Sequence, residues 1–468
     1  MVDAQSRTAV YRAMGVGICA WLWGAHAVWA QPLAPRVYDE ELRIRMDQQA
    51  PSRQEVTVDG GGWLSLGMLD YDDDPASTQR TLLQSQLRGW SQVGLRDTHV
   101  FYVRGLLEYD DWKRNNSPTS RGDDSFERLE RAWYGLNVGR LFGWDPSGRA
   151  ELGVKAGRDF QTLGNSLVLS LPLDMLSAEA EVDAWQFRTF AGTTLYRSLN
   201  MDPSPLVKDH QDRVLWGAEL AYEGLSDHRP FVYCLWNWDH TDPSAPSPAQ
   251  SYQYDSRYFG VGSRGILITD EVRYAVELVL ERGRTYSDGA ASGRDRIEAW
   301  AFDASLEYLI PHTPSGRLTL EYMFGSGDPD RTRSAVATVG GNTVHTPDQA
   351  FNALGWRDTG MASAMALSNL HILACGASLF PWARFQGLEV GGKVFVYAKD
   401  WRDGAISDTL ATLSERWVGC EWDLFCNWRW TSDLAWTLRY GMFHPGDAYN
   451  EGDDSSRDFL YTGLVFSF

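Results

Sequence analysis

Residues 458–468 read Asp-Phe-Leu-Tyr-Thr-Gly-Leu-Val-Phe-Ser-Phe. Counting back from Phe468, every second residue suits an apolar surface, and the residues between them are, apart from Val465, small or amphipathic. Side chains of a strand alternate between its two faces, so this pattern predicts a strand with one apolar side. The stretch ends on an aromatic residue with no charged tail, which is typical of a strand that closes a barrel in lipid.

Composition leaves two broad classes open. A chain of 468 residues can hold two or three soluble domains or one large barrel. Beyond the N-terminal region there is no run of about eighteen apolar residues, which excludes helical spans there but not a barrel, whose alternating strands dilute the hydropathy signal. Aromatic residues reach 13%, as expected where girdles line two membrane interfaces. The net charge of −19 argues against nucleic-acid binding.

The N-terminus has the pattern of a secretory leader. Two arginines precede an apolar run from Ala13 to Ala30, whose small last residue suits cleavage. An uncleaved anchor helix is the alternative, but the run is short and a proline follows it closely. We therefore predict a signal peptide over 1–30, a polar periplasmic segment over 31–58, and an outer-membrane β-barrel of a Gram-negative cell over 59–468.

From Gly60 onward the chain is a succession of alternating segments separated by turn-forming residues. Short connections alternate with long ones, like the periplasmic turns and external loops of bacterial barrels. The alternation breaks once, between 160 and 179, and one more strand built on Leu-Val-Leu-Ser-Leu at 167–171 restores it. We therefore predict an all-β transmembrane antiparallel barrel of eighteen strands, with sixteen as the alternative. The other segments are 60–71, 80–95, 98–112, 127–141, 149–159, 180–197, 211–224, 228–240, 253–266, 270–285, 296–310, 315–326, 366–380, 384–400, 414–430, 433–444 and 458–468.

Within these segments, apolar and charged side chains occupy opposite faces. In 270–285, for example, Leu278 and Leu280 alternate with charged residues. A β-sandwich shows similar alternation, with its apolar face inward. Strands of up to about seventeen residues, such as 384–400, are long for a sandwich and suit tilted membrane strands.

The charged face of such a barrel would line an aqueous lumen. Of the 43 basic residues 38 are Arg, whose planar group forms paired hydrogen bonds with carboxylates and phosphates. Two interpretations are open: a path that selects anionic solutes, or a ladder of ion pairs that holds lumen side chains in place. The basic residues on this phase are Arg88, Arg104, Arg131, Arg188, Arg264, Arg273, Lys393, Arg429 and Arg439. The acids are Glu108, Glu277, Glu281, Asp303, Glu307, Glu321, Glu389, Glu421 and Asp423.

The longest predicted external loop, 327–365, has two interpretations: a lid that folds into or over the channel, or an ordinary surface loop. Aspartate clusters occur in predicted loops at 72–74, 110–111, 123–124 and 453–454. None has the spacing of a calcium-binding loop, so we interpret them as solvated charge rather than as divalent-ion sites.

No sequence pattern requires catalysis. The nine His are scattered, and neither a Gly-x-Ser-x-Gly nor a His-Glu-x-x-His motif is present, nor a Walker motif. We therefore expect no enzymatic activity, no cofactor and no metal.

Several motifs in the last two-thirds of the chain resemble the alginate-export family of outer-membrane barrels. The most specific is Tyr-Gly-Met-Phe-His-Pro-Gly-Asp-Ala at 440–448, preceded by Glu-Trp-Asp-Leu at 421–424. Earlier members of the set are Phe-Asn-Ala-Leu at 351–354, Ser-Asn-Leu at 368–370 and Leu-Phe-Pro at 379–381.

A further motif concerns one arginine. Gly157-Arg158-Asp159 is similar to the Gly-Arg-Gln strand end of the same family, with Asp159 in place of the usual Gln. The resemblance implies that Arg158 joins the substrate path in the lumen. By alternation with Val154 and Ala156 it faces lipid, so a bulge or the strand end must redirect it inward.

The resemblance also implies an eighteen-stranded barrel, in agreement with the loop count, and export of an anionic exopolysaccharide such as alginate. We therefore predict a passive outer-membrane channel, or porin, that contacts lipid and lipopolysaccharide and receives its polymer from periplasmic delivery proteins. The alternative is a general or small-solute porin, and an outer-membrane enzyme ranks below both.

Overall fold

The computed structural model describes residues 56–73, 78–96, 98–113, 124–142, 150–195, 213–240, 254–286, 294–311, 315–331, 342, 345–355, 357–382 and 387–468. The predicted signal peptide and nearly all of the predicted periplasmic segment lie outside these residues. The elements are β1 (Val56–Asp73), β2 (Thr78–Leu95), β3 (His99–Trp112), β4 (Asp124–Asn137), α3 (Val138–Phe142), β5 (Ala150–Thr162), β6 (Ser170–Val182), β7 (Trp185–Thr194), β8 (Arg213–Tyr222), β9 (His228–Asp239), β10 (Tyr254–Ile266), β11 (Val272–Tyr286), β12 (Arg294–Ile310), β13 (Gly316–Gly325), β14 (Leu370–Leu379), β15 (Leu388–Lys399), β16 (Trp417–Arg429), β17 (Leu434–Pro445) and β18 (Arg457–Ser467).

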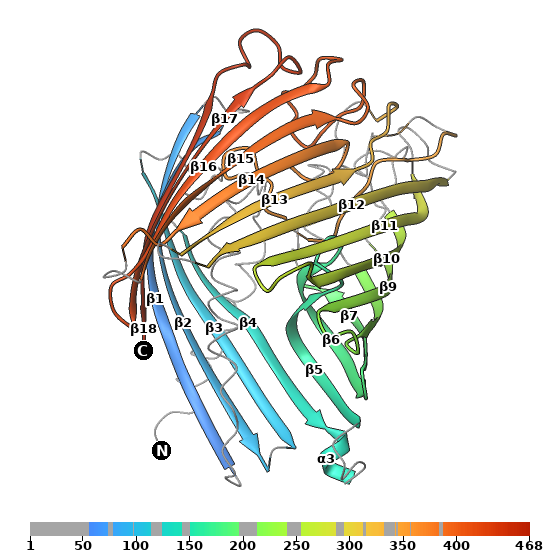
Figure 1. Ribbon diagram of the computed structural model, residues 1–468, viewed down its shortest axis with the longest axis vertical. Helices are drawn as coiled ribbons and strands as arrows, with labels where there is room; N and C mark the ends of the chain where they lie inside the picture. The colour runs from blue at the N-terminus through green and yellow to red at the C-terminus, as the bar shows by residue number, and fades with distance from the viewer. Residues whose placement is uncertain are drawn as a thin grey trace, which may run out of the picture.

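The eighteen strands form one closed antiparallel barrel (Figure 1). β18 pairs with β17 along one edge and with β1 along the other, where Trp63 lies opposite Ser467 and Leu64 opposite Phe466. The final strand therefore closes the barrel, because it leaves no open sheet edge in lipid. The prediction of eighteen strands is confirmed. Among the described residues, no helix is long and apolar enough to cross a membrane.

The additional strand predicted between 160 and 179 exists, but its position differs from the prediction. It is β6, and the predicted segment 180–197 contains the hairpin turn between β6 and β7, with Asp183 at a φ of +52°. The apolar residues Leu167 to Leu169 precede β6 and are at most 1% exposed. Their hydrophobicity serves burial inside the barrel rather than contact with lipid.

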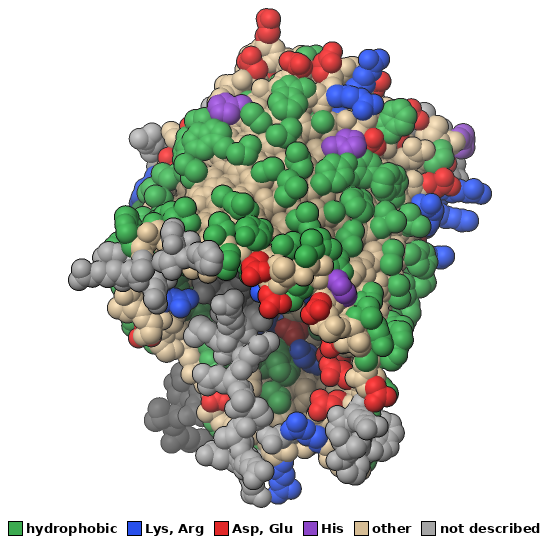
Figure 2. All heavy atoms as spheres, viewed as in Figure 1, with side chains coloured by type: hydrophobic (Ala, Val, Ile, Leu, Met, Phe, Trp, Pro, Cys, Tyr) green, Lys and Arg blue, Asp and Glu red, His purple; other side chains and the backbone are tan. Residues whose placement is uncertain are grey.

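The two faces of the wall differ as the alternation predicts. On β11, Leu278 and Leu280 are 37% and 44% exposed, whereas Glu277 and Glu281 are 0% exposed inside. Figure 2 shows hydrophobic side chains over the middle of the visible wall and charged side chains at its upper end and along its hollowed lower margin. An apolar belt between two charged ends is the pattern of a barrel that spans a bilayer.

The backbone ladder between β4 and β5 is shorter than either strand. It runs from Ala132 opposite Arg158 to Asn137 opposite Gly153. The part of β4 that precedes Ala132 is therefore hydrogen-bonded to β3 but not to β5. A bulge in β4 opposite Arg104 shifts the β3–β4 register next to the place where the β4–β5 ladder ends. We call this place the β4–β5 seam.

The main hydrophobic core lies inside the barrel. Residues 163–169, between β5 and β6, and the described parts of 345–369, between β13 and β14, turn inward and pack against the inner wall. We call these two segments the inner plug. Leu354 donates a backbone hydrogen bond to the Val168 carbonyl oxygen at 2.7 Å, and Ser170 donates to the Leu354 carbonyl at 2.9 Å. The described part of the predicted loop 327–365 thus folds into the lumen; residues 332–341, 343–344 and 356 lie outside the described residues.

Candidate functional site in the barrel lumen

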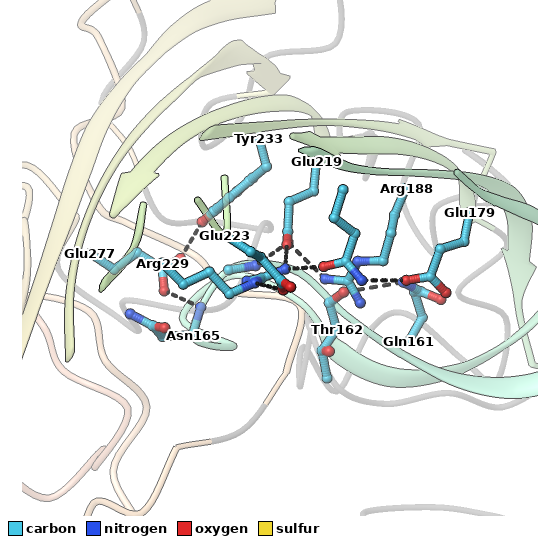
Figure 3. A network of polar contacts seen from close by, with 12 residues as sticks. Gln161, Thr162, Asn165, Glu179, Arg188, Glu219, Glu223, Arg229, Tyr233 and Glu277 are labelled. Carbon is cyan, nitrogen blue, oxygen red and sulfur yellow. Dashed lines mark hydrogen bonds and ion pairs between the residues drawn. The ribbon is translucent and has the colours of Figure 1, made fainter. Parts of the chain in front are cut away.

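Figure 3 shows the polar network that holds the first segment of the inner plug. Glu219 of β8 accepts a hydrogen bond from the Gly164 backbone N–H at 2.8 Å, and Glu277 of β11 accepts from Asn165 at 2.7 Å. Tyr233 of β9 donates to Glu277 at 2.5 Å. Both carboxylates are buried, and loss of a charged hydrogen-bond partner at such a site costs about 1–3 kcal/mol. These two acids therefore act as anchors of the plug.

Acids on the other side of the barrel hold the second segment in the same way. Glu421 of β16 accepts from the backbone N–H groups of Ala362 at 2.6 Å and Ser363 at 3.0 Å. Asp423, two residues along the same inner face, accepts from Met361 at 3.2 Å. The family-like motif at 421–424 is therefore an anchoring motif, because both of its acids bind plug backbone.

Arg357 lies where the two segments of the plug meet. Its guanidinium donates to the Asn165 carbonyl oxygen at 2.9 Å, pairs with Glu321 at 2.8 Å and contacts Asp303. Burial lowers the pKa of Arg357, and the nearby Glu277 opposes that change. Arg stays protonated in proteins, so the plug carries a positive charge that acids of the wall compensate.

Two of the predicted lumen cations serve the plug as well. Lys393 of β15 forms an ion pair with Asp358. Partial desolvation inside the barrel would raise the pKa of Asp358, but the charge and hydrogen bond of Lys393, a backbone N–H and Arg439 together lower it. Arg439 of β17 is only 4% exposed. Both cations therefore neutralise a carboxylate of the plug.

Other basic side chains line the inner wall near the short turns, which is the periplasmic end of the barrel. Arg188 of β7 pairs with Glu219 at 2.8 Å, and Arg317 of β13 pairs with Glu307 and Glu389 at 3.5 and 3.3 Å. Similar pairs occur along the intervening strands. We call this set the basic row; it comprises Arg188, Arg229, Arg264, Arg273 and Arg317.

Arg264 differs from the rest of the basic row. It lies in register with Arg229 on the neighbouring strand, its side chain is exposed, and it makes no ion pair within the described residues. Arg229 itself pairs with Glu219 at 3.3 Å and Glu223 at 3.1 Å. Like charges opposite each other on a sheet repel, and an anionic solute placed between them would relieve that repulsion. Arg264 is therefore the strongest candidate for direct contact with a solute.

The wall formed by β1–β5 carries a separate charged group. Arg88 and Arg104 pair with one acid at 3.0 and 2.9 Å, and Arg131 and Lys155 pair with another at 3.6 and 2.8 Å. The bulge opposite Arg104 turns two consecutive β4 residues inward, which is how both an acid and a base reach the lumen there. We call this group the β1–β5 cluster: Arg88, Arg104, Arg131, Lys155, Glu130 and Asp159.

The structure places Arg158 on the outer face, which corrects the prediction that it is redirected inward. It pairs with Asp174 of β6 at 2.8 Å, and Asp174 shares its face with Leu176, which is 57% exposed. There is no register shift between β5 and either neighbour, so plain alternation holds. Arg158 also donates to the Leu129 carbonyl oxygen at 3.0 Å and so bridges the β4–β5 seam.

The last predicted cation, Arg429, lies on the inner phase and is exposed at the periplasmic end of β16. Sequence reasoning omitted Arg229, Arg317 and Lys155, although each lies on the inner phase of its strand and the same alternation could have identified it. It also omitted Glu130, which lies in the bulge, and no periodic signal marks a bulge.

The described residues offer no metal centre. No group of three or more His, Cys, Asp or Glu among them is arranged to hold a metal ion. The chemistry that the lumen presents is instead ion pairing and hydrogen bonding to a solute.

The closed barrel, its apolar belt and its charged lumen define an integral outer-membrane β-barrel channel. The chain belongs to the alginate-export family, because the sequence model of that family, described as alginate export, matches residues 176–462, more than half of the chain. No curated protein sequence matches it significantly.

Solved structures show the same fold at low sequence identity. OccK11 (OpdR) of Pseudomonas aeruginosa is 14% identical, with a TM-score of 0.54 and coverage of 88% of this chain and 96% of that chain. The outer membrane protein opdK of Pseudomonas aeruginosa is 11% identical, with a TM-score of 0.52 and coverage of 88% and 99%. OccAB4 of Acinetobacter baumannii is 9% identical, with a TM-score of 0.54 and coverage of 89% and 100%.

Proposed function

We propose that this channel passively conducts an anionic exopolysaccharide of the alginate type across the outer membrane. The observation that carries the proposal is the pair Arg229 and Arg264, in register on the inner wall, with Arg264 exposed to the lumen. Guanidinium groups form charge-assisted, paired hydrogen bonds with carboxylates, which are the repeating charge of a polyuronate. Membership of the alginate-export family supports the same substrate class.

The acids that pair with the basic row support conduction rather than tight capture. Glu219, Glu307 and Glu389 each pair with an arginine of that row. A conducting pore must bind a solute strongly enough to admit it and weakly enough to release it, and a competing carboxylate weakens each contact. The polymer would cross without catalysis or a cofactor, and periplasmic proteins would deliver it.

The inner plug favours a second candidate, a porin for small carboxylates. Plug and wall share a buried core within the lumen, which leaves less room for a polymer than an empty barrel of the same strand number. The same basic row would then act on a single carboxylate rather than on a chain of them.

Ion selectivity in planar bilayers tests the proposal. Purified full-length protein is placed under a salt gradient, with and without a polyuronate on the periplasmic side. We expect anion-selective current that the polyuronate blocks, and weaker block in Arg264→Gln. Anion-selective current that a monomeric uronate blocks but a polyuronate does not would favour the small-solute porin. Cation-selective current without any block would contradict both.

A further inference from the structure

Three aromatic rings lie side by side on the inner wall of β2, β3 and β4. The ring centroids of Trp90 and Tyr102 are 6.2 Å apart with planes at 19°, and those of Tyr102 and Trp133 are 5.4 Å apart at 17°. They share the inner phase with Arg88, Arg104 and Arg131 of the β1–β5 cluster. We call Trp90, Tyr102 and Trp133 the aromatic row.

Glycines beside the row let its two indoles lie against the wall. A Cβ at Gly61, which faces Trp90 in register, would lie 3.2 Å from the Trp90 Nε1. A Cβ at Gly135, two residues beyond Trp133, would lie 3.1 Å from its Cζ3. Bare backbone at both places allows each indole to cover the sheet. Both indoles nevertheless remain partly exposed.

Positive charge borders the row. The Lys155 ammonium lies 4.5 Å from the centroid of a Trp133 ring, within the range of a cation–π contact. Arg104 is in register with Trp90 on one side and with Arg131 on the other. The adjoining β1–β5 cluster places four bases and two acids on the same part of the inner wall.

We infer that the aromatic row and the β1–β5 cluster form a subsite that binds the uronate residues of a polysaccharide. A pyranose ring presents an apolar C–H face, which stacks on an aromatic ring, and a uronate adds a carboxylate at its edge. The two partly exposed indoles of the row supply the flat apolar surface, and Lys155 and Arg131 supply the cations beside it. This assignment rests on the proposed function and specifies the part of the lumen that recognises sugar rather than charge alone.

Within the wall, the rings and the charges make separable contributions. Stacking on an aromatic ring depends little on salt, whereas ion pairing with Lys155 weakens as salt rises. A purely structural role of the two indoles would change neither the affinity for sugar nor its salt dependence, provided that the barrel folds.

The test is equilibrium binding of a fluorescently labelled oligouronate to the full-length protein in detergent, read by anisotropy at several salt concentrations. We compare Trp90→Leu, Trp133→Leu, the conservative Trp133→Phe and Lys155→Gln. Phe101→Leu, on the outer face of β3 at 47% exposed, is the matched control. Heat-modifiable migration on gels reports whether each variant folds.

We expect Trp133→Leu and Trp90→Leu each to weaken binding by about tenfold with an unchanged salt dependence, the effect of losing one aromatic contact. Trp133→Phe should recover most of the affinity, Lys155→Gln should reduce the salt dependence, and Phe101→Leu should bind as the parent does.

Three outcomes would overturn the inference. Tight binding to the parent protein with unchanged affinity in folded Leu variants removes the subsite and leaves the proposed function standing. A neutral oligosaccharide that binds as tightly as the oligouronate removes the uronate assignment. No binding of the oligouronate to the parent protein, together with no block of current, removes the proposed function and the subsite with it.

Discussion

Two parts of the inner wall use the same residue types in different ways. On β8, β11 and β16, acids such as Glu219, Glu277 and Glu421 are buried and accept backbone N–H groups of the inner plug. On the β1–β5 wall, Glu130 and Asp159 accept from Arg and Lys side chains of the wall itself. The first wall holds the plug in place, and the second keeps an aromatic and basic surface. Inward-facing charged side chains of this barrel therefore have more than one role.

Removal of an anchor should have the largest effect. Glu421→Ala leaves two plug N–H groups without their acceptor. The Tyr397 hydroxyl loses its contact with Glu421 but keeps the Thr359 carbonyl oxygen as its acceptor. We expect a loss of about 2–3 kcal/mol in the free energy of unfolding and a larger single-channel conductance as the plug loosens. Denaturant titration in detergent and bilayer recordings measure the two.

The control for that change is Glu389→Ala on β15, whose acid pairs with the Arg317 and Asn427 side chains instead of plug backbone. Because this acid pairs with the basic row and not with the plug, we expect anion selectivity to rise without the larger conductance that a loosened plug gives. Equal conductance changes in both variants would show that Glu421 holds the plug no more than any other inward acid does.

The next effect concerns the turn that enters the plug. Gly164 has a φ of +56°, and a Cβ there would lie 2.7 Å from Tyr233 and 2.8 Å from Glu277. Gly164→Ala should destabilise the barrel by about 1–2 kcal/mol because it adds a clash to the cost of a left-handed conformation. Gly452→Ala, with a φ of +104° and no atom within 4 Å, isolates the conformational cost. A smaller loss for Gly164→Ala than for Gly452→Ala in denaturant titration would contradict the anchoring geometry.

The next prediction concerns the ion selectivity that the β1–β5 wall confers. Glu130→Gln removes the acid shared by Arg88 and Arg104 while it keeps the shape of the side chain. We expect the anion-to-cation permeability ratio, from reversal potentials, to rise about twofold. Loss of the folded barrel instead would mean that Glu130 is an anchor like Glu421.

The smallest effect should come from the β4–β5 seam. Arg158→Gln removes the bonds to Asp174 and to the Leu129 carbonyl, both on the partly exposed outer face. We expect a loss of about 0.5–1 kcal/mol in the free energy of unfolding. Faster hydrogen exchange should be confined to the N-terminal part of β4 and the C-terminal end of β5. Exchange that accelerates equally in β11 would show that the seam has no special weakness.

The sequence predicted the wall well because its signal is local. Leu278 and Glu277 are neighbours in the chain, and their opposite characters state which face each occupies without knowledge of any partner strand. The prediction was wrong or incomplete where a non-local contact decides. Arg158 looked like a lumen residue by resemblance, but the register of β5 with β6 sets it beside Asp174 on the outside. Leu167 to Leu169 looked like part of a strand because burial in a plug and contact with lipid both require apolar side chains.

By itself, the sequence determined the class of fold, the strand number and the inner and outer phases, since each follows from a two-residue period and from the lengths of connections. Only the tertiary structure decided which inward charged side chains bind the plug and which face the lumen. Glu421 and Lys393 serve the plug, whereas Arg264 faces the lumen beside Arg229. The physical reason is that alternation sets the side of the sheet, while partnership depends on strand register and on loops that return from far along the chain.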